Sequence, residues 1–342
     1  MAVAAPFPKI ELHLHVEGSV RPERLLEIAR RNDHPLPVDT VDELRDLFRF
    51  RDFAHFIQTW ILVTSALRTA DDFREILVDY AEEAAGHGAV YLEAIFSPAE
   101  RVRRGSSWDD VFGGFCDGVV EARERFGVEI RLTPDITRGF TDEEAAETVR
   151  YGAKYRDRGV VGVGLGGLER EFPPELSVEA FRLARELGLA SVPHAGEVAG
   201  AASVQGAIES LHADRIRHGI RAVEDPGLVR EIAGRGLVLD VCPLSNLRTG
   251  AVASLDEHPL PTLLDAGVRC SISTDDPAMF DTDLGRDYAA ACTWGHSPRV
   301  FYEAGVAGAL CDEATRERLR AIGEAYAWDD VEVPGTERDI AR

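Results

Sequence analysis

The sequence predicts a parallel (β/α)8 barrel, an α/β fold of the TIM type, and three observations lead to this class. Short apolar, β-branched runs recur along the chain, amphipathic helical stretches separate them, and the runs number eight. Strands that alternate with helices are typical of parallel βαβ units, and eight such units close into a barrel. The candidate strands cover about residues 9–15, 89–96, 128–136, 160–166, 189–194, 214–218, 236–241 and 268–274. The length of 342 residues and the hydrophobic content of 45% suit one large domain, which we expect to span residues 1–342.

Capping patterns mark the helices between these strands. Asp71–Gly86 begins with aspartates and ends at a glycine, Thr141–Arg156 begins with Thr-Asp-Glu-Glu, and Ser177–Leu187 stops before a glycine. A long insertion at about 22–88 separates the first two strands and contains several predicted helices, including Phe53–Leu67. We expect this insertion to cap the mouth of the barrel.

Composition and charge exclude several classes of protein. The net charge of −22 repels phosphate backbones, so a nucleic-acid partner is not expected. No run approaches the ~18 apolar residues that span a bilayer, and Met1–Pro8 lacks the features of a signal peptide. The five cysteines are scattered and form no CxxC pair, which favours reduced thiols over disulfides. We therefore expect a cytoplasmic protein with a small-molecule partner. The sequence gives no indication of its oligomeric state.

The first strand carries two histidines at a spacing that suits a metal ion. His13 and His15 lie two residues apart, and residues i and i+2 of a strand point to the same face. The pair stands at the carboxyl end of the strand, where a barrel builds its active site. Two imidazoles on one face can bind one metal ion.

Further ionisable residues stand at the ends of later strands. His194 ends the fifth strand and Glu197 comes shortly after it, His218 ends the sixth, and Asp275 and Asp276 follow the eighth. Three imidazoles and one carboxylate are a suitable ligand set for zinc, with a further position for water. Zinc lowers the pKa of bound water from 15.7 to roughly 7, and the remaining groups could orient that water and move protons.

Each motif also has a simpler interpretation when it is taken alone. An HxH pair is often a surface or core pair, and Glu197 could be a carboxylate at a helix N-terminus. The segment Asp275–Pro277 could be an ordinary turn. Their common position at strand ends favours one metal-dependent site instead.

Five segments together resemble the adenosine deaminase family of the amidohydrolase superfamily. They occur in the order typical of that family and extend over most of the chain: Glu11–Gly18, His194–Glu197, Arg215–Gly219, Cys242–Asn246 and Ser273–Pro277. The resemblance implies hydrolytic deamination of a 6-aminopurine at C6, with release of ammonia.

The resemblance also implies a role for each matching residue. One zinc ion would be bound by His13, His15, His194 and Asp275. Glu197 would protonate N1 of the purine, and His218 would orient the attacking water and help to deprotonate it. Asp276 would hold that water or the purine N7. The substrate contacts implied are His15, Glu17, Gly167 and Asp276.

Two departures from the family pattern lie where the 5′ side of a nucleoside would bind. Typical adenosine deaminases have Asp-Gly after the HxH pair, and this chain has Glu17-Gly18. Gly167 is followed by Leu168-Glu169-Arg170, and neither Gly-Asp-Glu nor the Ser-Ser-Glu of adenine deaminases is present.

We therefore expect a 6-aminopurine nucleoside that differs from adenosine on its 5′ side. The 6-aminodeoxyfutalosine deaminase type, from the futalosine route to menaquinone, fits best. Its substrate carries a benzoate that needs a cation, and the candidates are Arg101, Arg103, Arg104 and Arg170. Adenosine deaminase and adenine deaminase are the alternatives, and a catalytically retired purine-binding barrel is the non-enzyme alternative. The presence of both Glu197 and His218 favours an enzyme.

Two mechanistic rivals lack their signature residues. Binuclear amidohydrolases commonly use a carboxylated lysine at the end of the fourth strand, but the only lysines are Lys9 and Lys154. A mononuclear site is therefore expected. Nucleobase deaminases with a His/Cys/Cys zinc site require a PCxxC segment, which the chain lacks.

Overall fold

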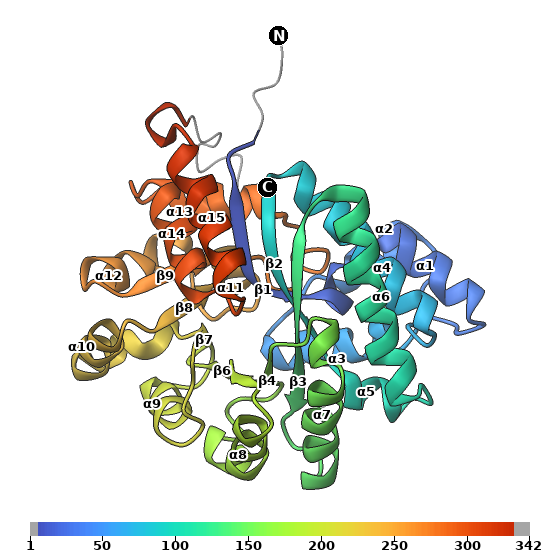
Figure 1. Ribbon diagram of the computed structural model, residues 1–342. Coiled ribbons are helices and arrows are strands. Elements are labelled where there is room, and N and C mark those ends of the chain that lie inside the picture. The colour runs from blue at the N-terminus through green and yellow to red at the C-terminus, as the bar shows by residue number, and fades with distance from the viewer. Residues whose placement is uncertain (1–5, 332–342) are drawn as a thin grey trace.

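Parallel strands run through the middle of the computed structural model, which describes residues 6–331, and helices surround them (Figure 1). The strands are β1 Lys9–His15, β2 Ala89–Phe96, β3 Glu129–Thr137, β4 Gly162–Gly166, β5 Ala190–Ser191, β6 His194–Ala195, β7 Ile216–His218, β8 Val238–Val241 and β9 Arg269–Ile272. They pair in the orders β1-β2-β3-β4-β5 and β6-β7-β8-β9. The His15 amide donates to the Asp275 carbonyl over 2.7 Å, which joins the last strand to the first. The predicted closed barrel is confirmed.

The fifth predicted strand, 189–194, is divided into β5 and β6. Pro193 lies between the two pieces and has no N–H to donate to a strand ladder. The Val192 amide still donates to the Val163 carbonyl over 2.9 Å, and the Arg217 amide donates to the Pro193 carbonyl over 3.0 Å. These bonds keep β5 and β6 in line as one side of the barrel.

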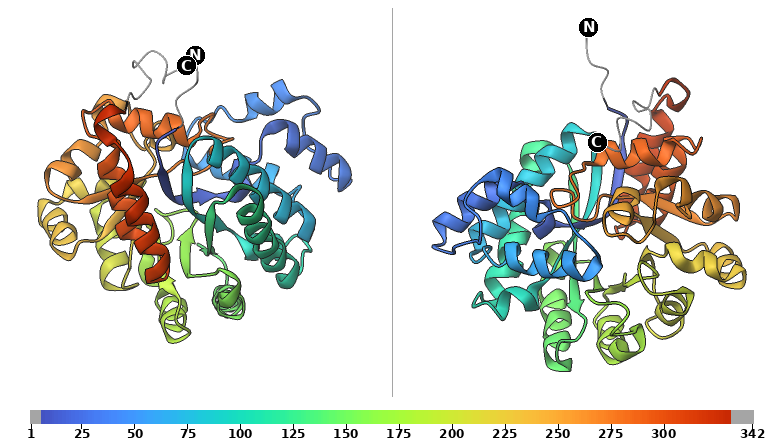
Figure 2. Two further views of the ribbon diagram at one scale, coloured as in Figure 1. Left: turned by 45° about the horizontal axis from the view of Figure 1, so that its top comes forward. Right: turned by 180° about the vertical axis from the view of Figure 1, so that it is seen from behind.

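Helices of the insertion follow β1, namely α1 Pro22–Arg31, α2 Val41–Leu47, α3 Phe53–Thr64 and α4 Ala70–Gly86. Figure 2 shows them, in blue, gathered on one side of the barrel. Thr69 caps α4 with a capping box, as the aspartate-rich start of that segment predicts. Only part of the insertion covers the mouth: α3 lines the pocket there, whereas α4 packs on the outside against α6.

The later helices form the outer ring visible in Figure 1. They are α5 Pro98–Val102, α6 Trp108–Phe126, α7 Asp142–Lys154, α8 Val178–Glu186, α9 Ala201–Glu209, α10 Pro226–Arg235, α11 Pro243–Arg248, α12 Leu260–Asp265, α13 Leu284–Cys292, α14 Pro298–Gly308 and α15 Glu313–Ala325. Among residues 6–331, no helix has the length and apolar character that crossing a membrane requires.

The alternation in β1 sends its two sets of side chains in opposite directions. Ile10 and Leu12 face α14, where a Cβ added at Gly305 would lie 2.8 Å from the Cβ of Ile10. The alternate positions Glu11, His13 and His15 therefore point into the barrel. Glu11 accepts hydrogen bonds from the Thr274 amide and hydroxyl over 2.9 and 2.6 Å, which fixes the chain next to Asp275.

Candidate active site

Four predicted metal ligands come together at the carboxyl ends of the strands. The Nε2 atom of His194 lies 3.0 Å from Nε2 of His13 and 3.0 Å from Nε2 of His15. Asp275 Oδ1 lies 3.2 Å from the His13 nitrogen and 3.4 Å from the His15 nitrogen. Side chains that are far apart in the sequence thus direct their donor atoms to one point.

The chemistry of this cluster fits a metal ion. Burial lowers the pKa of His13, His15 and His194 well below 6.5, so all three imidazoles are neutral and can act as ligands. His194 Nδ1 lies 3.0 Å from the Leu165 carbonyl, which fixes the hydrogen on Nδ1 and leaves Nε2 free to coordinate. The Ser245 hydroxyl donates to Asp275 Oδ2 over 2.6 Å and leaves Oδ1 facing the histidines.

His218 lies beside this cluster and is a second candidate for the third imidazole ligand. It groups with His13, His194 and Asp275 within 4.8 Å. Its Nε2 is nevertheless 3.7 Å from Asp275 Oδ2, and the nearer His15 lies within 3.4 Å of Oδ1 of the same carboxylate. His15 is thus the nearer of the two to the Asp275 carboxylate, and both His15 and His218 line the pocket beside it.

The backbone at two of these residues is strained. His218 has φ 63° and Asp275 has φ 68°, which are left-handed values that side chains other than glycine rarely adopt. Such conformations cost of order 1–3 kcal/mol each and persist where the surroundings impose them. Their occurrence at two adjacent side chains of the cluster is typical of a functional site.

A chain of hydrogen bonds fixes the tautomer of His218. The Leu260 amide donates to His258 Nδ1 over 3.0 Å, so the hydrogen of the neutral His258 ring is on Nε2. That Nε2 lies 3.1 Å from Asn246 Oδ1, and Asn246 Nδ2 lies 3.2 Å from His218 Nδ1. Nδ1 of His218 therefore accepts a hydrogen bond, and Nε2 carries the hydrogen. This tautomer suits a group that orients water, and Nε2 could accept a proton only after a change of tautomer.

Glu197 is buried, and its carboxyl group is held in the acid form. Burial raises the pKa of Glu197 well above its ordinary value, and the nearby Asp275 and Glu169 raise it further. Its Oε2 lies 3.6 Å from His218 Nε2. A buried carboxylic acid at this position can donate a proton at neutral pH.

Glu169 anchors the loop that carries Glu197, a role that our sequence analysis missed. Its carboxylate accepts the amides of Gly196, Glu197, Val198 and Ala199 and the Ser203 hydroxyl. The only feature of the sequence that could have indicated this role is the position of Glu169, an acidic residue two positions after the glycine that follows the fourth predicted strand.

The carboxylate of Asp276 lies between α3 and the helical turn Val16–Ser19 that follows β1. Trp60 Nε1 donates to Asp276 Oδ1 over 2.9 Å, so the insertion helix contributes directly to the site. Gly18 approaches the same carboxylate so closely that an added Cβ would lie 1.7 Å from Oδ1. Burial and the neighbouring Asp275 raise the pKa of Asp276 well above its usual value.

We expect Gly18→Ala to displace Asp276 and to lower kcat/KM by about 10²-fold, the typical effect of a 1 Å misplacement in an active site. Gly234→Ala is the matched control, because a Cβ at that helical glycine meets nothing within 4 Å. Steady-state kinetics of the two variants tests this prediction. Wild-type kinetics in Gly18→Ala would mean that the position of Asp276 does not matter for turnover.

Three members of the cluster, His15, His194 and Asp275, line a cavity of about 230 Å³, called here the central pocket. One wall is apolar and comes from α3, with Phe53, Ile57 and Ile61. Gly167 also lines the pocket and has φ 106°, a value that requires glycine. Glu17 is buried behind the wall: its Oε1 accepts the Ser97 amide over 2.8 Å, and its Oε2 has no partner among the described residues.

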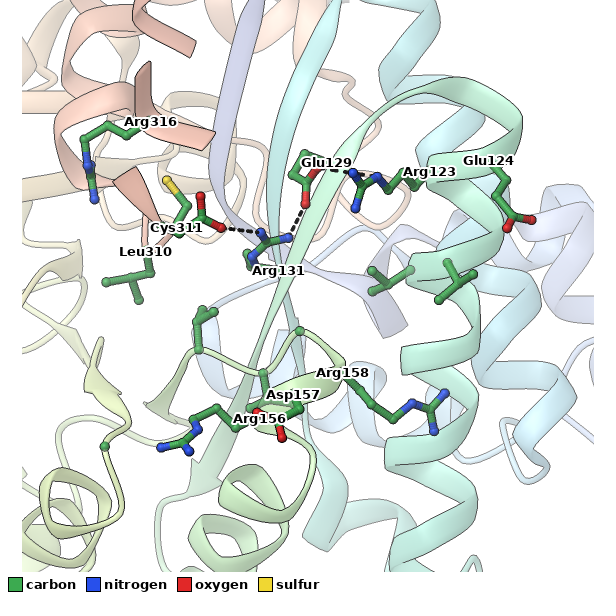
Figure 3. A pocket seen from close by; sticks show the side chains of 17 residues that line it. Arg123, Glu124, Glu129, Arg131, Arg156, Asp157, Arg158, Leu310, Cys311 and Arg316 are labelled. Atoms are coloured by element: carbon green, nitrogen blue, oxygen red, sulfur yellow. Dashed lines mark hydrogen bonds and ion pairs between the residues drawn. The ribbon is translucent and has the colours of Figure 1, made fainter. Parts of the chain in front are cut away.

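A larger groove of about 1040 Å³ lies beside the beginnings of β3 and β4, and Figure 3 shows its charged lining. Glu129 faces both Arg123 and Arg131, and Arg131 also lies 3.7 Å from Asp312. Because these charges neutralise one another and no predicted site residue lines the groove, we place the active site in the central pocket.

The chain is similar to known proteins over most of its length. A family model described as adenosine deaminase matches residues 8–322. An aminodeoxyfutalosine deaminase from Acidothermus cellulolyticus is 53% identical over 328 residues, 94% of this chain and 92% of the relative. The crystal structure of an adenine deaminase from Arthrobacter aurescens has a TM-score of 0.88 at 29% identity, covering 93% of this chain and 98% of that chain. An amidohydrolase structure from Burkholderia ambifaria with bound zinc has a TM-score of 0.84 at 29% identity, covering 93% and 90%.

Proposed function

The chain belongs to the adenosine deaminase family, and from this premise we propose that it hydrolyses the 6-amino group of 6-aminodeoxyfutalosine and releases ammonia. The observation that carries the proposal is the 53% identity to an aminodeoxyfutalosine deaminase over 94% of the chain. Placing the reaction in the futalosine route to menaquinone follows from that substrate. The described cysteines are free thiols, which supports a reducing, cytoplasmic location.

The metal site of the proposal holds one zinc ion through His13, His15, His194 and Asp275. Neutral imidazoles and a carboxylate are the ligands that zinc accepts, and the zinc-bound amidohydrolase of similar fold supports this choice. When bound, the ion supplies Lewis-acid activation of water.

The side chains around the cluster perform the proton transfers. Glu197, in its acid form, donates a proton to the purine ring nitrogen N1, and C6 becomes electrophilic. His218, through Nε2–H, and Asp276 hold the attacking water on line with C6. Water adds its oxygen to C6 and the C6–N bond breaks. One proton of the water goes to the amino group, which leaves as ammonia, and the other restores the acid form of Glu197, whose first proton stays on N1 of the oxopurine.

The remaining contacts would position the purine and its 5′ side. Gly167 would offer its backbone N–H to N3, and His15 would contact the substrate beside the metal. Glu17 would reach the ligand only through Oε2, the oxygen that has no partner among the described residues.

The test is a comparison of kcat/KM for 6-aminodeoxyfutalosine, adenosine and adenine, followed by the absorbance change from amino- to oxopurine. We expect at least about a 10²-fold preference for 6-aminodeoxyfutalosine, because its extension adds binding that the smaller substrates lack. The second candidate is adenine deaminase, favoured by the adenine deaminase of similar structure. A clear preference for adenine or adenosine would overturn the proposal, and absence of turnover with all three would indicate a retired barrel.

A further inference from the structure

A second cavity lies next to the central pocket. It has a volume of about 460 Å³ and is called here the outer groove. Phe53, Leu168 and Glu169 line both cavities, so the two share a wall. Arg51 and Arg170 line only the outer groove. A ligand that starts at the metal cluster and passes Phe53 and Leu168 would reach these arginines.

Both arginines of the outer groove lack an acidic partner. Within residues 6–331, neither Arg51 nor Arg170 forms an ion pair. Arg170 donates from Nε to the Val198 carbonyl over 2.8 Å, which positions the guanidinium and leaves its terminal nitrogens for another acceptor. Both guanidiniums are exposed to solvent, so they can bind an anionic ligand without first breaking an ion pair.

The other arginines considered for this role are engaged elsewhere. Arg101 is fully buried and donates to Thr64. Arg103 forms a two-bond ion pair with Glu144, and Arg104 lies 3.6 Å from Glu100. The structure thus retains Arg170 from the sequence candidates and adds Arg51.

Two of the three acidic groups in the lining of the outer groove are engaged by donors other than the arginines. Asp52 caps α3 by accepting the His55 amide over 2.8 Å, and five donors surround the carboxylate of Glu169. Glu171 is the other acidic residue in the lining. Its negative charge would repel an anionic ligand. Substitution of Glu171 therefore tests whether the ligand carries a negative charge.

We propose that the outer groove binds an aromatic carboxylate carried on the 5′ side of the substrate. The carboxylate lies between Arg51 and Arg170, and the ring packs against Phe53 and Leu168. The inference rests on the proposed function, because it places the purine in the central pocket. It identifies the residues that would distinguish 6-aminodeoxyfutalosine, with its benzoate, from adenosine.

The first experiment compares Arg51→Gln, Arg170→Gln and the double variant with the wild-type enzyme. Each single change should raise KM for 6-aminodeoxyfutalosine by about 10-fold, since a hydrogen bond between charged groups is lost. The values of kcat, and of kcat/KM for adenosine, should stay within about twofold. Arg103→Gln is the matched control and should leave KM unchanged for both substrates. Glu171→Gln should lower KM for 6-aminodeoxyfutalosine only.

The outcomes separate the groove from the proposed function. The role of the groove would be overturned if the double variant had an unchanged KM for 6-aminodeoxyfutalosine. It would also be overturned if kcat/KM fell equally for 6-aminodeoxyfutalosine and adenosine. If the wild-type enzyme does not deaminate 6-aminodeoxyfutalosine, the proposed function fails, and benzoate binding by calorimetry tests the groove by itself. The groove is supported if the double variant weakens benzoate binding at least about 10-fold, and it is rejected if the affinities are equal.

Discussion

Glu197→Gln is expected to lower kcat by about 10²- to 10⁴-fold, the usual contribution of a positioned acid or base. Glutamine has nearly the same shape but has no carboxyl proton to transfer to N1. Since burial and the charges of Asp275 and Glu169 raise the pKa of Glu197, the wild-type group is an acid at neutral pH. Activity should therefore fall as the pH rises through that raised pKa. Glutamine does not titrate, so this alkaline decline should be absent from the residual activity of the variant.

The controls for Glu197→Gln separate lost chemistry from lost structure. Glu171→Gln removes a carboxylate from the outer groove and should leave kcat unchanged. Thermal unfolding and metal content should match the wild-type protein in both variants. Full activity in Glu197→Gln, or an alkaline decline that persists in it, would refute the role of Glu197 as proton donor.

Strand positions were accessible from the sequence because each strand is a short apolar run with a clear boundary. The run at 9–15 matches β1, and the run at 89–96 matches β2. The division of the fifth strand at Pro193 was missed, although a proline inside an apolar run indicates a break in the ladder. Barrel closure then places His13, His194 and Asp275 together, because the carboxyl ends of all strands meet at one mouth.

The supporting contacts of the site could not be predicted, because they depend on three-dimensional packing between distant segments. Trp60 reaches Asp276 from the insertion, and His258 reaches His218 through Asn246. Arg51 lies in an insertion whose path no local pattern defines. Motifs identify residues that carry chemistry, whereas the groups that orient them have ordinary sequence surroundings.

Removal of the metal is expected to abolish turnover, and one equivalent of zinc per chain should restore it. The ligand residues are neutral histidines and one carboxylate, and none of them alone can activate water to the extent that zinc does. A chelated sample should therefore lose activity while its fold is retained, because the barrel is built from strand pairing and an extensive core. Activity assays with metal analysis during zinc titration provide the measurement.

Metal removal should also make the folded protein less stable in acid. The direction of this pH dependence follows from the pKa values of the histidines. Burial lowers the pKa of His13, His15 and His194 well below 6.5 in the folded chain, whereas in the unfolded chain they titrate near 6.5. Below that pH the unfolded state binds more protons, so stability declines as the pH falls.

Bound zinc opposes unfolding by mass action, and a free zinc concentration of about 1,000 times Kd adds about 4 kcal/mol to the free energy of unfolding. Melting temperatures of the chelated and zinc-loaded protein should therefore differ at neutral pH, and that of the chelated protein should fall as the pH is lowered below about 6.5. Equal melting temperatures, or full activity after chelation, would contradict a metal bound by these four residues.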